Sequence, residues 1–169
     1  MNLDLATKIA ERIRTKLAPH CERIEIAGSI RRRKSEVGDI EIACIPKTYE
    51  TGMFFGGDTV VDPEFCALVE RWPAVKGKPT GKYMQRVLPE GIKLDIFIAH
   101  PENWGLIFAI RTGSAEYSHR VLASAWVRAG YHSIDGMLVQ GFHRIEVREE
   151  RELFDLIGLP WADPWERNL

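Results

Sequence analysis

Residues 28–42 read GSIRRRKSEVGDIEI, and the rest of the sequence is best interpreted outward from this stretch. It opens with the small pair Gly28-Ser29, continues through a basic run and ends in Gly38-Asp39-Ile40-Glu41-Ile42. Alternating apolar and acidic positions are typical of a half-buried strand, on which residues two apart point to the same face. Asp39 and Glu41 are therefore expected to project together. Two like charges side by side are unfavourable without a positive neighbour, and a divalent cation is the natural one.

The sequence on either side of the acids predicts two neighbouring strands that end at one site. Residues 23–27 (RIEIA) alternate as a strand does, so Gly28-Ser29 falls at its carboxyl end. Residues 30–36 are expected to form a loop or short turn, followed by a second strand over 38–45. This order predicts a site at one edge of a sheet.

A third acid lies in another alternating stretch. In residues 92–98 (IKLDIFI), Asp95 shares its face with Lys93 and Phe97. An acid in such a strand either faces solvent at a sheet edge or joins Asp39 and Glu41 to complete a metal site.

The rest of the chain predicts an ordinary mixture of helices and strands. Residues 48–63 have no clear period and are expected to form a mobile surface hairpin or loop, with the alternative that they cover the site. The basic stretch around Lys76, Lys78 and Lys82 suits a solvated turn or a phosphate-binding one equally. Periodicity, glycines and prolines predict helices at 3–18, 64–72, 103–111, 115–129 and 150–158, and short strands within 137–147.

Composition limits the class of protein. The 169 residues, 45% of them apolar and 28% charged, suit one domain or two small subdomains. The net charge of -1 excludes a uniformly basic nucleic-acid coat but allows a local basic patch. Three scattered cysteines argue against a disulfide framework or a zinc site. With no signal-peptide run and no membrane span in sight, we expect a cytoplasmic protein, in the host-cell cytoplasm if it is viral.

These motifs, in this order, resemble the nucleotidyltransferase core of family X DNA polymerases, the DNA polymerase beta group. The likeness covers nearly the whole chain: Gly-Ser-x-Arg-Arg at 28–32, Gly-Asp-x-acid at 38–41, Asp95 in an apolar strand, Thr-Gly-Ser at 112–114, and the tail at 152–167. The resemblance implies an α+β fold. A palm over residues 1–101 would hold a mixed sheet with helices on one face, and a small α/β thumb would follow over 102–169.

The resemblance also implies a DNA-directed nucleotidyltransferase, of the gap-filling repair type, that adds dNMP from dNTP to a primer 3′-hydroxyl. Asp39, Glu41 and Asp95 would be catalytic and hold two Mg²⁺ ions, or Mn²⁺. The implied partners are dNTP and primer-template or gapped DNA, with no membrane, and the protein would act as a monomer. Nucleotide binding would fall to Gly28, Ser29, Arg32, Gly38, Thr112, Gly113 and Ser114, and DNA binding to Lys82, Lys93, His119 and Arg120.

Three departures from the family pattern affect this interpretation. The second acid is Glu41 rather than Asp, so its carboxylate reaches about 1 Å further or folds back. Ile110 and Arg111 replace the aromatic pair that screens the sugar 2′-hydroxyl, which weakens the expected rejection of ribonucleotides. Since only palm and thumb fit in 169 residues, we also expect the lyase domain and fingers of larger members to be absent. Arg31, Arg33 and Lys34 are expected to be surface charges.

Two other functions fit the same residues. One is a template-independent nucleotidyltransferase that acts on RNA, a small molecule or a protein. The other is a non-catalytic nucleic-acid-binding relative, which the three surviving acids disfavour. Primer extension that follows the template base would separate the first of these from a DNA-directed polymerase.

Overall fold

The computed structural model describes residues 1–52 and 57–169. Its strands are β1 (Cys21–Ile26), β2 (Asp39–Pro46), β3 (Thr48–Thr51), β4 (Asp58–Val61), β5 (Ala74–Lys76), β6 (Tyr83–Val87), β7 (Lys93–Ile98), β8 (His132–Ile134), β9 (Met137–Gln140) and β10 (His143–Ile145). Its α-helices are α1 (Leu3–Leu17), α2 (Gly28–Arg31), α3 (Pro63–Glu70), α4 (Trp104–Thr112), α5 (Ala115–Tyr117), α6 (Ser124–Arg128) and α7 (Glu150–Leu156).

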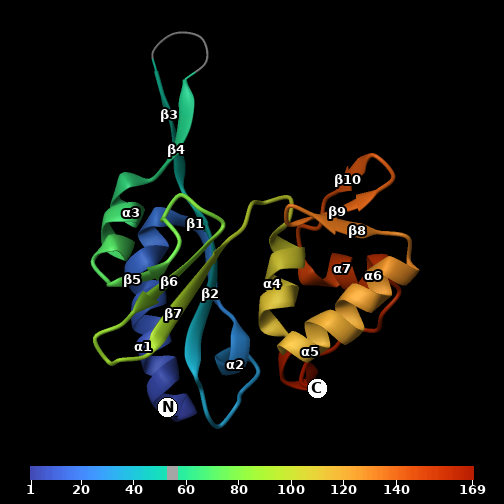
Figure 1. The fold of residues 1–169 in the computed structure, drawn as a ribbon, viewed down its shortest axis with the longest axis horizontal. Helices are drawn as coiled ribbons and strands as arrows, with labels where there is room; N and C mark the ends of the chain where they lie inside the picture. The colour runs from blue at the N-terminus through green and yellow to red at the C-terminus, as the bar shows by residue number, and fades with distance from the viewer. Residues whose placement is uncertain (53–56) are drawn as a thin grey trace.

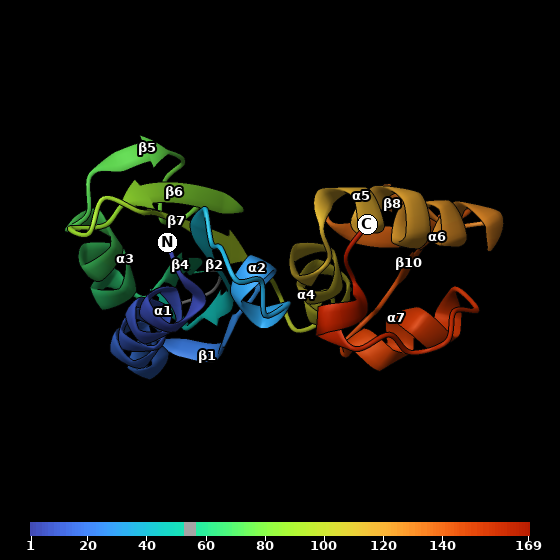
Figure 2. The ribbon, with the colours of Figure 1, turned by 90° about the horizontal axis from the view of Figure 1, so that it is seen from below.

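A five-stranded mixed sheet forms the first half of the molecule, in the order β1-β2-β7-β6-β5. Only β2 and β7 run parallel in it. Helices α1 and α3 cover one face (Figure 2), because alternate apolar residues such as Ile40, Ile42, Leu94 and Ile96 point toward them and are fully buried. This is the predicted α+β arrangement, with helices on one face of a mixed sheet.

The opposite face of this sheet looks toward the second half of the chain. Ala43 and Ile45 of β2 pack in a small core with Trp104 and Phe108 of α4. Asp39 and Glu41 lie at alternate positions of the same strand and therefore on this face. The acids thus lie on the face of β2 that packs toward α4, and Figure 1 shows β2 and α4 on the facing sides of the two halves.

The second half has its own core around a three-stranded antiparallel sheet, β10-β9-β8. Leu106, Leu122, Leu138 and Leu153 are fully buried in that core. A π-helical segment over Ser118–Ala123 joins α5 to α6. The placement of a palm–thumb boundary at residue 101 stays a prediction. No helix of the described residues is long and apolar enough to cross a membrane.

Most predicted elements are present. Gly28–Arg31 is a short helical turn, which overlaps the start of the loop or short turn expected over 30–36. Strands β5 and β8 were not predicted, because three residues carry too little pattern. Residues 48–63 include the hairpin β3–β4, which projects from the far end of β2 (Figure 1). The described part of this hairpin does not cover the acids, and residues 53–56 lie outside the described residues.

Ion pairs join the two halves, and they correct one prediction. Arg31 was expected to be a surface charge, which is wrong. Its guanidinium donates to both carboxylate oxygens of Glu150 at 2.9 and 2.6 Å, and also contacts Thr112 Oγ1. Glu150 is buried and contacts the fully buried Arg167 as well. A separate, exposed pair joins Arg23 to Glu149 at 2.6 and 2.9 Å.

Candidate active site

The structure brings the three acids onto two neighbouring strands. In the parallel pairing of β2 with β7, Glu41 lies opposite Asp95 and Asp39 lies opposite Lys93. Asp95 is buried in an interior strand, so the alternative of a solvent-facing edge residue is wrong. Three carboxylates from distant sequence positions therefore share one face of the sheet.

The pKa values of two of these carboxyl groups show the electrostatic cost of the arrangement. Burial and then the charge of Asp39 raise the pKa of Glu41 to about 7, against the opposing effect of Arg32. Burial and then the charge of Asp95 raise the pKa of Asp39. The acids are close enough to repel one another, and a cation between them would relieve that repulsion.

Glu41 lies against the backbone of Gly28. A Cβ built on Gly28 would be 1.7 Å from Glu41 Oε2 and 2.5 Å from its Cδ. Gly28 also has φ of +60°, a conformation that glycine adopts at little cost. The glycine thus allows the longer glutamate to fold back between the Gly-Ser turn and the sheet.

The turn that begins at Gly28 is fixed to the acidic strand, because the Ala27 N–H donates to the Glu41 carbonyl at 2.8 Å. Ser29 Oγ is buried and has no hydrogen-bond partner among the described residues. A buried hydroxyl without a partner is costly, so this oxygen is suited to a ligand.

Arg32 connects this turn to the Thr-Gly-Ser turn. Its Nη1 donates to the Thr112 carbonyl at 2.7 Å and its Nε to Asn168 Oδ1 at 3.0 Å. Burial lowers the pKa of Arg32, while the charges of Glu41 and Asp39 raise it. Arg32 therefore adds positive potential at the acids while its side chain is already bound to the second half of the chain.

The Thr-Gly-Ser turn itself is closely packed. Ser114 Oγ accepts from the Tyr117 N–H at 3.0 Å and so caps α5. A Cβ on Gly113 would be 2.7 Å from Ser118 Oγ. The Thr112 hydroxyl is bound to Arg31, whereas Gly113 borders an open cavity of about 310 Å³.

Two side chains that bind Asp95 were missed in the sequence. Tyr83 Oη and Gln85 Nε2 each lie 2.8 Å from Asp95 Oδ1. Burial and then this hydrogen bond raise the pKa of Tyr83 to about 12. In the sequence, the alternation of Tyr83 and Gln85 with Met84 and Arg86 indicates that the first two share one face of a strand. The order of the strands in the sheet is what places Tyr83 and Gln85 beside Asp95.

The side chain of Arg111 extends from α4 to the sheet, where it contacts Phe97 of β7. Its guanidinium lies 4.1 Å from the centre of the Phe97 ring, and its Nε is buried without a partner among the described residues. Burial lowers the pKa of Arg111, against the charge of Glu41. Arg111 and Glu41 both border the cavity next to Gly113.

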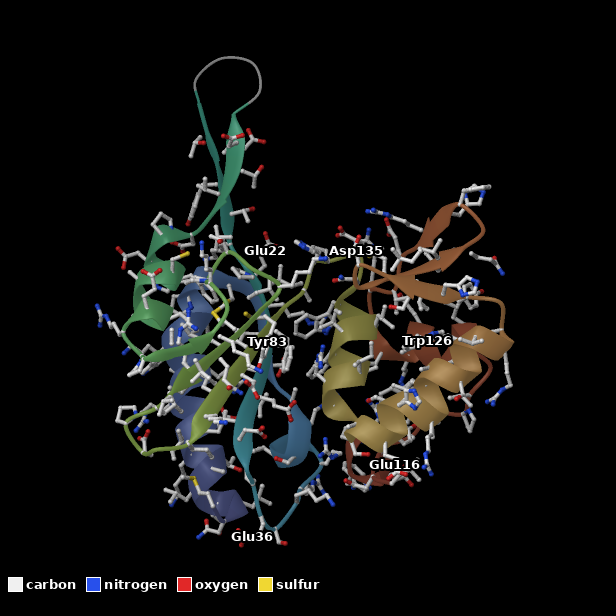
Figure 3. All side chains as sticks on the ribbon, viewed as in Figure 1. Glu22, Glu36, Tyr83, Glu116, Trp126 and Asp135 are labelled. Atoms are coloured by element: carbon white, nitrogen blue, oxygen red, sulfur yellow. The ribbon has the colours of Figure 1, made fainter. Side chains whose placement is uncertain are left out.

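The residues predicted to bind DNA are exposed, and they do not form one cluster. Lys82 pairs with Asp135 at 3.2 Å where β6 approaches the β8–β9 turn; Figure 3 labels Asp135 there. Lys93, His119 and Arg120 are exposed on β7 and the π-helical segment, and Arg120 pairs with Glu116 at 2.9 Å. Gly38 precedes β2, and a Cβ there would meet no atom within 4 Å.

The donor set suits a hard divalent cation, because carboxylate oxygens are the ligands that Mg²⁺ prefers. In the described residues, no three His, Cys, Asp or Glu side chains are gathered tightly enough to enclose one ion. The reason is visible in two of the acids: Glu41 is folded against Gly28, and one oxygen of Asp95 is bound by Tyr83 and Gln85. The mutual repulsion of the acids and the unpartnered Ser29 hydroxyl still fit a cation with an anionic ligand.

This combination of a mixed palm sheet with a thumb is the fold of polymerase beta. The chain is similar to the crystal structure of the Leishmania infantum polymerase beta ternary P/T complex, with a TM-score of 0.73 and 18% identity over 100% of this chain and 77% of that chain. The ternary gap complex of the same protein gives a TM-score of 0.72 and 18% identity over 99% and 70%. No curated protein matches the chain.

The second half of the chain can be assigned more closely. Residues 108–168 match the family model of the DNA polymerase beta thumb. Residues 108–168 therefore resemble that thumb, which agrees with the family that the motifs at 28–41 and 112–114 suggested.

Proposed function

We propose that the protein is a DNA-directed nucleotidyltransferase that adds dNMP from dNTP to a primer 3′-hydroxyl, in gap-filling repair synthesis. The observation that supports this most directly is the placement of Asp39, Glu41 and Asp95 on one face of β2 and β7, beside the Gly28-Ser29 turn. Nucleotidyl transfer needs negative charge to be neutralised on the attacking and the leaving oxygen at once.

In this proposal Asp39, Glu41 and Asp95 would hold both metal ions. Two Mg²⁺ ions, when bound, supply Lewis-acid activation of the 3′-hydroxyl and charge neutralisation at the leaving pyrophosphate. Ser29 Oγ and the backbone N–H groups around Gly28 would donate hydrogen bonds to phosphate oxygens. Arg32 stabilises the triphosphate through its charge, while its hydrogen bond to Thr112 sets the position of the turn that the nucleotide sugar approaches.

DNA as the acceptor is supported by the thumb and by the solved structures. The similar Leishmania protein was crystallised as ternary P/T and gap complexes. Lys82, Lys93, His119 and Arg120 are exposed, and each would contact a phosphate.

A template-directed assay tests the proposal. The protein is incubated with a one-nucleotide-gapped duplex, each dNTP or NTP in turn, and Mg²⁺ or Mn²⁺. We expect one dNMP to be added, chosen by the template base, and no addition in EDTA. Addition that ignores the template, or no transfer under any of these conditions, would refute a DNA-directed polymerase.

Arg111 favours one alternative. A charged guanidinium, in place of an aromatic side chain, borders the cavity next to Gly113 with Glu41. A cation there attracts hydroxyl and phosphate groups rather than excluding a 2′-hydroxyl. Efficient transfer from NTPs without a template in the same assay would identify a template-independent nucleotidyltransferase.

A further inference from the structure

Strand β6 presents two hydrogen-bond donors to a single oxygen of Asp95. In the antiparallel pairing of β6 with β7, Gln85 lies opposite Asp95 and Tyr83 lies opposite Phe97. Directly opposed and diagonal neighbours are both within reach across such a pair. Gln85 Nε2 and Tyr83 Oη lie 2.8 Å from Oδ1, while Oδ2 has no hydrogen-bond partner in the described part of the chain.

The chemistry of the groups fixes the direction of both bonds. An ionised carboxylate only accepts hydrogen bonds, so the Gln85 amide must present its nitrogen and Tyr83 its O–H. The Tyr83 ring is held in turn by stacking on Phe97, with ring centroids 5.1 Å apart. Figure 3 shows Tyr83 on the side of the palm sheet that faces the thumb. Neither donor side chain is free to turn away without losing these contacts.

We propose that Tyr83 and Gln85 are positioning residues for Asp95, an inference that rests on the proposed function. Together they fix the plane of the carboxylate and occupy Oδ1, so that Asp95 offers only Oδ2 to a metal ion. The other two acids are oriented differently: Glu41 is confined by Gly28, and Asp39 stands at the start of β2. Tyr83 and Gln85 therefore affect the affinity and geometry of the metal site through Asp95, its third ligand.

Neither residue borders the cavity next to Gly113, the turn that we propose the nucleotide sugar approaches. Their loss should therefore change metal binding and the rate of transfer, and leave the KM for dNTP unchanged. This separates a positioning role from substrate binding. Outer partners of metal ligands are typically worth about 10- to 100-fold in metal affinity or activity.

The test uses Tyr83→Phe, which keeps the stacked ring, and Gln85→Met, which keeps the length of the side chain. Tyr49→Phe and Gln140→Met make the same changes at exposed positions on β3 and at the end of β9. Mn²⁺ affinity is measured by electron paramagnetic resonance with gapped DNA whose primer ends in a dideoxynucleotide, together with dNTP. Single-turnover rate and KM are measured on the extendable primer, and thermal midpoints check the fold.

We expect Tyr83→Phe and Gln85→Met each to weaken Mn²⁺ binding or slow transfer by about 10-fold with KM unchanged, and the controls to match the wild type. Wild-type Mn²⁺ affinity and rate in both site variants, even with a lowered thermal midpoint, would overturn the positioning role while the proposed function stands. A wild-type protein that transfers no nucleotide would overturn the proposed function and this inference with it.

Discussion

Replacing Gly28 with alanine should damage the site more than it damages the fold. Two effects combine at this position. An L-residue at φ of +60° costs roughly 1–2 kcal/mol. The new methyl would also lie 1.7 Å from Glu41 Oε2, and since carbon contacts are comfortable near 3.5 Å, the carboxylate must retreat by roughly 1.5–2 Å.

Gly91→Ala is the matched control. Gly91 has φ of +79°, and a Cβ there meets no atom within 4 Å. It carries the same backbone strain without displacing a side chain. At roughly 2–4 °C per kcal/mol for a chain of this size, Gly91→Ala should lower the thermal midpoint by about 2–8 °C. Gly28→Ala should lose roughly a further 1 kcal/mol for the displaced Glu41 rotamer.

Activity separates the two variants. A displacement of about 1 Å at a reacting centre can cost on the order of 100-fold in rate, so Gly28→Ala should lose about that much single-nucleotide incorporation. Gly91→Ala should keep the wild-type rate at a temperature where both are folded. Shortening the acid in Gly28→Ala/Glu41→Asp should recover part of the loss. Equal rates for Gly28→Ala and Gly91→Ala would refute the idea that the Glu41 carboxylate acts from its place against Gly28.

Two further predictions concern stability. The folded-state pKa of Glu41, about 7, lies above its ordinary value of 4.5, so the folded protein binds this proton more tightly than the unfolded chain does. The resulting stabilisation of the folded state is fully present below about pH 4.5 and is lost as the pH rises through 7. In the absence of divalent cations, Glu41→Gln should therefore stabilise the protein by about 2–3 kcal/mol near pH 8 and by little near pH 4. Urea unfolding at the two pH values measures this difference, and equal effects would count against the raised pKa of Glu41. Arg31→Met leaves the buried Glu150 without its palm partner and should cost about 3 kcal/mol, whereas Arg23→Met, whose partner Glu149 is exposed, should cost at most about 1 kcal/mol. Thermal unfolding of the two variants measures that difference, and equal losses would contradict the assigned burial.

The period-two pattern was enough to predict the strands that carry Asp39, Glu41 and Asp95, because alternation is a local property of the sequence. The pairing of Glu41 with Asp95 was not local. It depends on the parallel placement of β7 next to β2, and the local pattern left Asp95 open between a metal ligand and an edge residue.

The misjudged and missed residues share one cause: their partners are distant in the chain. Arg31 looked like a surface charge because Glu150, its partner, lies in a helix of the thumb. Tyr83 and Gln85 became relevant only once β6 was placed beside β7. A local sequence pattern cannot reveal a hydrogen bond when the order of the strands determines which residue is the partner.

The central claim is that the carboxylate of residue 95 works with those of residues 39 and 41 to drive metal-dependent nucleotide transfer. Asp95→Asn, compared with Asp155→Asn on the exposed side of α7, tests it most directly in single-turnover incorporation on gapped DNA with Mg²⁺. The account predicts that Asp95→Asn keeps the wild-type thermal midpoint to within a few degrees and loses at least about 1,000-fold in rate, while Asp155→Asn keeps both. Incorporation by folded Asp95→Asn at a rate near that of the wild type would contradict it.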